Sequence, residues 1–323
     1  MEQTGSPYIS VIIMAYKSVR FGNDAVNSVN CNEFDRSLYE VILVLMDPDD
    51  SAEYDPGSYS SVMIYKGRKF GDCIMDSVRK CRGDVICFLD DDDIFFPGKL
   101  KTVYDYFTRY NDLSYLHNHF VHNQNCVPVS SGKTPEHIIL NQGNLHDFKR
   151  YSRKAYYLNN SSWSVKKAEL IRAAQFISKV NLSLDVSLFS LAMSSAGKFI
   201  HIEKNLSMYR LHDKNRTSGI NRRDRKDMLP LSEDCITIYG YAIGPDCRFN
   251  CDRIAAWAIL IRISSSLINN DMTLRELIGI LNNYSKIKSA HRTGLAWRLI
   301  LYFTVPPKIF NRLYQAFNKL ILA

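Results

Sequence analysis

The sequence lacks the features typical of disulfide-rich, zinc-binding and membrane-spanning proteins. Its 8 cysteines include no Cys-x-x-Cys pair, so neither a disulfide framework nor a zinc site is expected. The sequence shows no signal-peptide pattern, and no stretch reaches the roughly 20 apolar residues that span a bilayer. We therefore expect a cytoplasmic protein, in which Asn-x-Ser/Thr triplets, such as those at Asn160, Asn205 and Asn215, carry no glycan.

Acidic residues are scarce in the last third of the chain. Residues 220–323 contain 15 Lys and Arg against 8 Asp and Glu, whereas residues 1–219 contain 26 basic and 25 acidic residues. Apolar residues of 309–322 share one helical face, with basic residues beside them. Such a helix suits a membrane interface, although docking within the protein or a dimer is an alternative. We expect peripheral association with the inner face of the cell membrane, and no nucleic acid partner.

Strands and helices alternate in the first part of the chain. Buried strands are predicted at residues 8–15, 40–46, 62–65 and 85–89, and helices at 18–29, at 70–81 and from Pro97. This alternation predicts an α/β fold with a mainly parallel sheet flanked by helices. Ligands bind such sheets at the carboxyl ends of the strands, where two acidic clusters fall, at residues 47–50 and 90–93.

The rest of the chain predicts further helices and a second region. Residues 123–150 form a long polar segment, which is typical of functional loops. Helices are predicted at 166–180 and 185–196, and a strand at 198–202. The basic stretch 220–226 is the predicted boundary between a catalytic domain, residues 1–219, and a C-terminal region, residues 220–323, made of a basic linker and helices.

The acidic run, residues 90–93, consists of four consecutive aspartates. Such carboxylates repel one another, and a divalent cation is the simplest group that neutralises them. On an extended segment Asp90 and Asp92 point to one side, and Asp91 and Asp93 to the other. Hard carboxylate oxygens suit Mg²⁺ or Mn²⁺. A solvated turn that caps the next helix is the alternative, but the position after a buried strand favours a metal.

Three histidines, His117, His119 and His122, could also suggest a metal site. His117 and His119 share a face of an extended segment, but no third ligand follows at a convincing spacing. We expect these rings to form hydrogen bonds within the protein, and a role in the acceptor site stays open.

Four motifs occur in the order found in family 2 glycosyltransferases with the GT-A fold. They are PYISVIIMAY at 7–16, YEVILV at 39–44, RGDVICFLDDDD at 82–93 and YRLH at 209–212. Together they make residues 7–218 resemble that family. No single motif decides the resemblance, but their agreement in order and spacing makes it specific.

The resemblance implies a nucleotide-sugar site at the strand ends. The nucleotide pocket would begin at Ala15 and Tyr16, and Asp90 and Asp92 would form the DxD pair. Asp90, with its neighbour Asp91, would bind the donor, and Asp92 would hold Mn²⁺ or Mg²⁺ and the diphosphate. The basic loop 66–71, which ends at Gly71, lies near a plausible phosphate position, although a solvated loop is equally consistent with it.

The resemblance also implies roles for three later residues. Asp185 would take the proton of the acceptor hydroxyl, Arg210 would bind the diphosphate, and His212 would be a further metal ligand. Residue chemistry alone leaves simpler alternatives open. Asp185 could cap a helix, and Arg210 could form a surface ion pair.

One position departs from the family pattern. Members usually carry an acidic pair at the end of the second strand, where Leu45 and Met46 stand here. Asp47 follows directly and is the candidate replacement. The nucleotide base, uracil or guanine, is therefore left open.

The predicted function is an inverting transfer of a sugar from a UDP- or GDP-linked donor to an acceptor hydroxyl or phosphate, on a glycan or a lipid-linked acceptor. A nucleotidyltransferase is one alternative, but such enzymes usually have a glycine-rich loop after the first strand, and residues 15–20 contain no glycine. A catalytically inactive nucleotide-binding relative is the other, favoured by Leu45 and Met46.

Overall fold

The computed structural model describes residues 8–15, 19–46, 54–55, 57–122, 137–140, 159–212, 234 and 237. The chain divides into two units, Met1–Arg222 and Arg223–Ala323, and the elements named below belong to the first. The predicted boundary at residues 219 and 220 and the predicted amphipathic tail lie outside the described residues. Within the described ranges, no helix is long and apolar enough to cross a membrane.

The first half of the sheet is parallel, as predicted. Its strands are β1 (Ile9–Ala15), β2 (Tyr39–Leu45), β3 (Ser61–Ile64) and β4 (Val85–Asp90), in the spatial order β3-β2-β1-β4. Every residue of β1 and β2 is buried. Continuous apolar runs of this kind form because both faces of a parallel sheet are covered. The carboxyl ends of β1 and β4 therefore lie side by side.

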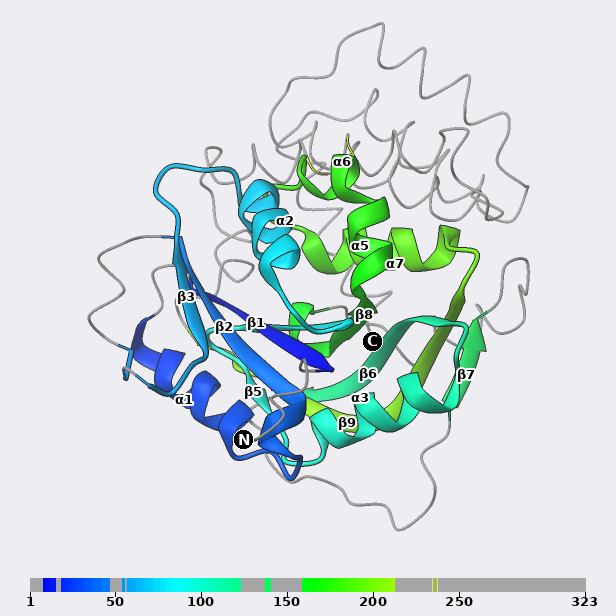
Figure 1. The fold of residues 1–323 in the computed structure, drawn as a ribbon, viewed down its shortest axis with the longest axis horizontal. Coiled ribbons are helices and arrows are strands. Elements are labelled where there is room, and N and C mark those ends of the chain that lie inside the picture. Colours follow the sequence, from blue (N-terminus) through cyan, green and yellow to red (C-terminus); the bar gives the residue numbers. More distant parts are fainter. Residues whose placement is uncertain are drawn as a thin grey trace, which may run out of the picture. The chain divides into compact units, whose positions relative to one another are not determined.

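Helices cover both faces of this sheet (Figure 1). One face carries α1 (Val19–Asn30) and α3 (Lys99–Arg109), and the other carries α2 (Phe70–Lys80), α5 (Lys167–Arg172), α6 (Ala174–Ile177) and α7 (Leu184–Ser194). The short 3-10 helix η1 (Arg36–Leu38) precedes β2. The helical prediction at 166–180 is confirmed in part, because two short helices, α5 and α6, lie there and are separated at Ala173. Leu170 and Ile177 are buried on either side of the break, so the apolar spacing gives no sign of it.

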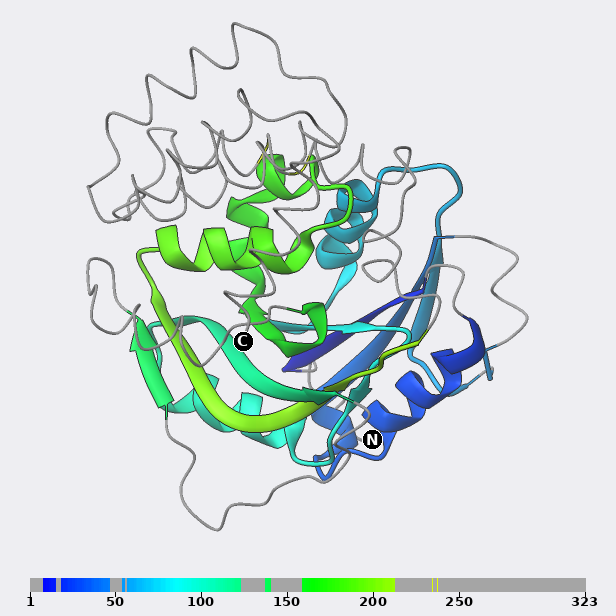
Figure 2. The ribbon, with the colours of Figure 1, turned by 180° about the vertical axis from the view of Figure 1, so that it is seen from behind.

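Antiparallel strands extend the sheet beyond β4. β8 (Trp163–Lys166) is antiparallel to β4 and to β6 (Leu113–His122). β9 (Lys198–Tyr209) is parallel to β6 and antiparallel to β5 (Ile94–Phe95) and β7 (His137–Leu140). The predicted strand at 198–202 thus continues to Tyr209. Register shifts against β6 accompany the bend of this strand (Figure 2), and the bend brings its end to the acidic run.

A buried histidine pair joins β6 to β9. The Nδ1 atoms of His117 and His201 lie 2.9 Å apart, and the ring of Trp163 packs against His117. Burial lowers the pKa of His117 well below its ordinary value, and the positive charges of His201, Lys99 and His119 lower it further. The prediction that His117 forms a hydrogen bond inside the protein is confirmed.

We expect this pair to make the fold sensitive to acid. Below about pH 6.5 an unfolded histidine takes up a proton, whereas buried His117 stays neutral, so acid favours the unfolded chain by up to about 1.4 kcal/mol per pH unit. Urea unfolding at two pH values on either side of 6.5 measures the loss. The variant His117→Gln should lose less stability than the wild type between them. Equal losses of stability in the variant and the wild type would show that His117 does not contribute to the acid sensitivity.

Candidate active site

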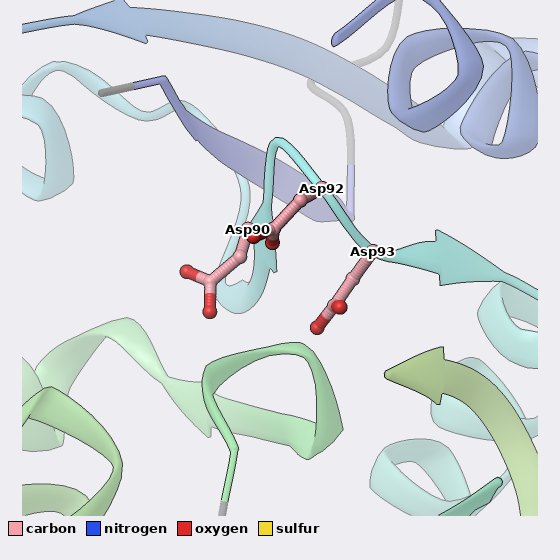
Figure 3. A group of neighbouring side chains, drawn as sticks. All are labelled: Asp90, Asp92 and Asp93. Carbon is pink, nitrogen blue, oxygen red and sulfur yellow. The ribbon is translucent and has the colours of Figure 1, made fainter. Parts of the chain in front are cut away.

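The acidic run starts at the last residue of β4 and turns immediately. The Asp93 N–H donates to the Asp90 carbonyl at 3.1 Å, and the Asp91 N–H donates to the Met14 carbonyl of β1 at 3.3 Å. Three of these aspartates come together: carboxylate oxygens lie within 4.8 Å of one another in Asp90, Asp92 and Asp93 (Figure 3). We call these three residues the acidic cluster. The predicted alternation was wrong for Asp93, since it assumed an extended segment. The turn places Asp93 with Asp90 and Asp92, and Asp91 is not part of this group.

The electrostatics of the acidic cluster favour a bound cation. Asp93 is fully buried. This burial raises its pKa well above the ordinary value, and the charges of Asp90 and Asp92 raise it further. A hard divalent cation would offset this repulsion, and oxygen ligands from carboxylates are those that Mg²⁺ and Mn²⁺ prefer. The donor set therefore fits the predicted metal.

The end of β9 brings two predicted residues to this cluster. His212 Nε2 lies 3.0 Å from Asp92 Oδ2. Adjacent ligand atoms in an octahedral Mg²⁺ site, with bonds of about 2.1 Å, are also about 3 Å apart. Arg210 donates from Nε to the Asp92 carbonyl at 3.0 Å and from its backbone N–H to Asp93 Oδ1 at 3.0 Å. Residues more than a hundred positions apart in the sequence thus meet at one site.

Two residues of α1, which the sequence did not reveal as functional, support Arg210 and His212. Arg210 Nη2 pairs with Asp24 Oδ2 at 3.1 Å. Its guanidinium carbon lies 4.2 Å from the centre of the Phe21 ring, and the rings of Phe21 and His212 are 5.1 Å apart. Such a cation–π contact helps to fix the side chain. The ion pair proposed as the simpler role of Arg210 is present, and its role as a diphosphate ligand stays a prediction.

The turn η4 (Asn160–Ser162) and its preceding residue Asn159 were also missed. Asn160 Nδ2 lies 3.0 and 3.1 Å from the two carboxylate oxygens of Asp90. Ser161 Oγ donates to Asp93 Oδ2 at 2.6 Å and accepts from the Asp90 N–H at 3.1 Å. Asn159 Nδ2 donates to Asp93 Oδ2 at 3.3 Å. The available signal is the polar run Asn-Asn-Ser-Ser directly before the buried strand β8.

Other predicted donor-binding residues fall at different places. Ala15 is buried at the end of β1, where its carbonyl accepts the Met46 N–H at 3.0 Å. Gly71 packs against α6, and a side chain there would overlap the Ile177 carbonyl. That close approach accounts for the glycine without a ligand, so its role in donor binding stays a prediction. Tyr16 and Asp47 lie outside the described residues.

The basic loop and Asp185 have protein partners of their own. Arg68 pairs with Asp76 at 3.3 Å, which is consistent with the solvated-loop alternative. Asp185 lies in the first turn of α7, where its Oδ1 accepts the Val186 N–H at 2.8 Å. The alternative role as N-cap was wrong, because Ser183 is the N-cap of α7 and Asp185 lies inside the first turn. The catalytic role of Asp185 stays a prediction.

Residues 10–168, which include β1, β4, the acidic cluster and η4, match the model of Glycosyl transferase family 2. The chain belongs to this family. This family 2 glycosyltransferase carries the acidic cluster at the place where the sequence motif predicted a DxD pair. The search among curated proteins found no significant match.

Solved structures confirm the GT-A-like fold of this glycosyltransferase. S. aureus TarS 1-349 in complex with UDP-GlcNAc is 15% identical, with a TM-score of 0.61 over 97% of this chain and 92% of that one. The mannosyltransferase PcManGT from Pyrobaculum calidifontis, in complex with GDP-Man and Mn²⁺, is 12% identical, with a TM-score of 0.53 over 98% of this chain and 89% of that one. At these identities the likeness establishes the fold.

Proposed function

We propose that this glycosyltransferase moves a sugar, with inversion, from a nucleoside-diphosphate sugar to an acceptor hydroxyl or phosphate, using Mn²⁺ or Mg²⁺ held at the turn after β4. The observation that carries the proposal is the acidic cluster with His212 Nε2 at 3.0 Å from Asp92 Oδ2. The complexes of TarS with UDP-GlcNAc and of PcManGT with GDP-Man and Mn²⁺ support it.

In this proposal Asp92 and His212 would hold the cation, which when bound would supply positive charge to stabilise the departing diphosphate. Asp90, half-buried and held by Asn160, orients the donor from the nucleotide side. Arg210 adds positive charge beside the cluster.

Asp185 acts as the general base of the proposed reaction. It takes the proton of the acceptor hydroxyl as the oxygen forms a bond to the anomeric carbon and the bond from that carbon to the diphosphate breaks. Attack on the face opposite the leaving group gives inversion. An acidic side chain is required for this step, and the family motif implies Asp185.

The acceptor is proposed to be a glycan or a lipid-linked molecule at the inner face of the cell membrane. The support is the basic balance of residues 220–323, with 15 Lys and Arg against 8 Asp and Glu. Sedimentation with anionic vesicles tests this part separately from catalysis.

Donor binding is tested by thermal unfolding in the presence of UDP, GDP and their sugar conjugates, each with and without Mn²⁺. A matching ligand at 100 times its dissociation constant should stabilise the fold by about 2.7 kcal/mol, or several degrees in Tm, and chelation by EDTA should remove most of that shift. A catalytically inactive relative would bind the nucleotide sugar and show the same thermal shift, but it would not transfer the sugar. If no nucleotide stabilises the protein in a metal-dependent way, the proposed donor site is wrong.

A further inference from the structure

Asp93 differs from the other two members of the acidic cluster in its surroundings. Its side chain is fully buried, whereas Asp90 and Asp92 are partly exposed. Protein donors reach both of its oxygens, from Ser161 (2.6 Å) and Asn159 (3.3 Å) at Oδ2 and from the Arg210 N–H (3.0 Å) at Oδ1. These contacts use about three of the roughly four lone-pair positions of a carboxylate. Little of Asp93 is left for a metal ion.

The same three contacts join segments that are far apart in the sequence. Ser161 and Asn159 belong to the η4 region, and Arg210 directly follows β9. Arg210 in turn donates from Nε to the Asp92 carbonyl at 3.0 Å and precedes His212 by two residues. Asp93 therefore connects the two residues proposed to hold the cation, Asp92 and His212. Moving Asp93 would change the distance between them.

The η4 turn is itself connected to a buried network of polar side chains. Ser162 Oγ lies 3.2 Å from Ser207 Oγ, and Asn118 Nδ2 donates to Ser207 Oγ at 3.2 Å. The side-chain amide oxygen Oδ1 of Asn118 accepts a hydrogen bond from the ammonium group of Lys99, whose side chain is fully buried. Burial lowers the pKa of Lys99 to about 8. These contacts tie the η4 turn to residues of α3, β6 and β9, so a shift of the turn that holds Asp93 would break them.

We propose that Asp93 and Ser161 are positioning residues, which hold Asp92 and His212 at the spacing a divalent cation needs, and that Asp93 is not itself a metal ligand. This inference rests on the proposed function, since it concerns the metal site assigned there. Members of the acidic cluster thus have different roles, and the run of four identical aspartates in the sequence does not reveal this difference.

The first test uses Ser161→Ala, which removes both hydrogen bonds of the hydroxyl and leaves Asp92 and His212 in place. The matched control is Ser77→Ala, because Ser77 is equally buried but donates to the Cys73 carbonyl within α2. Mn²⁺ affinity is measured by EPR titration, and the bound imidazole by its ¹⁴N modulation. We expect Ser161→Ala to weaken Mn²⁺ binding about 10- to 100-fold and to reduce the ¹⁴N signal, with Ser77→Ala like the wild type. Ser161→Cys, which keeps a weak donor, should recover part of the affinity and serves as the test variant if Ser161→Ala does not fold.

The second test separates a positioning role from a ligand role. Excess Mn²⁺ should restore most sugar transfer or donor hydrolysis in Asp93→Asn, because both proposed ligands remain, but should not restore it in Asp92→Asn. If Ser161→Ala keeps wild-type affinity and ¹⁴N signal, or if Asp93→Asn resists rescue as Asp92→Asn does, the inference is overturned. Wild-type protein that binds no Mn²⁺ at all would instead overturn the proposed metal site, and this inference with it.

Discussion

Replacing Asp92 with alanine is expected to slow sugar transfer about 10³-fold. A bound cation stabilises the charge of a leaving diphosphate by several kcal/mol, and each 1.4 kcal/mol or so changes a rate about tenfold. Asp92 is the member of the acidic cluster that lies 3.0 Å from His212, so its loss should remove both a ligand and the partner of a second ligand. Steady-state rates at saturating donor and several Mn²⁺ concentrations measure the effect.

The matched control for Asp92→Ala is Asp105→Ala. Asp105 is an exposed residue of α3 that pairs with Lys101 one turn earlier, at 2.8 Å, and such surface pairs contribute little. Its removal should leave both the rate and the Mn²⁺ dependence unchanged. If Asp92→Ala behaves like this control, the metal assignment is wrong.

The second large effect is expected for Asp185→Asn, with a loss of about 10²- to 10⁴-fold in kcat. The amide oxygen can still accept the Val186 N–H, as the Asp185 carboxylate does at 2.8 Å, so the contact in the first turn of α7 is kept. Folding and donor binding should therefore be preserved, whereas proton transfer from the acceptor hydroxyl is lost. Single-turnover rates and a nucleotide thermal shift on the same sample measure the two properties separately.

The dependence of kcat on pH distinguishes a general base from a carboxylate that only stabilises the first turn of α7. A general base works only when deprotonated, so wild-type kcat should fall on the acid side of its optimum. That fall should disappear in Asp185→Asn. A variant with wild-type kcat and a merely lowered Tm would show that Asp185 only stabilises α7 and that another residue accepts the proton.

The sequence was sufficient for the parallel half of the sheet. β1 and β2 are continuous apolar runs because both of their faces are buried, and such runs stand out in any window of the sequence. The acidic run could be placed at the end of β4 for the same reason, since this strand is apolar up to Leu89 and Asp90 is its last residue. The motif at residues 209–212 led to His212 through the family resemblance, and the structure places it beside Asp92.

The contacts that organise the acidic cluster could not be predicted in the same way. Ser161 and Asp93 are separated by 68 positions, and Arg210 and Asp93 by 117. Hydrogen bonds between single side chains at such distances leave no periodic pattern in the sequence. The misplacement of Asp93 has a local cause, because period-two alternation holds only for extended chain, and the residues after Asp90 form a turn. The length of β9 was missed because polar residues interrupt its apolar pattern, for example Lys204 and Asn205.

The most direct test of the central claim is the release of nucleoside diphosphate from UDP- and GDP-linked sugars by the purified protein, measured in Mn²⁺ and in EDTA. Water can replace the unidentified acceptor in this assay, so no acceptor is needed. We expect at least one donor to be cleaved in Mn²⁺, with cleavage about 10²-fold slower or absent in EDTA. Cleavage at the same rate in EDTA, or no cleavage of any donor, would contradict the account of a metal-dependent nucleotide-sugar transferase.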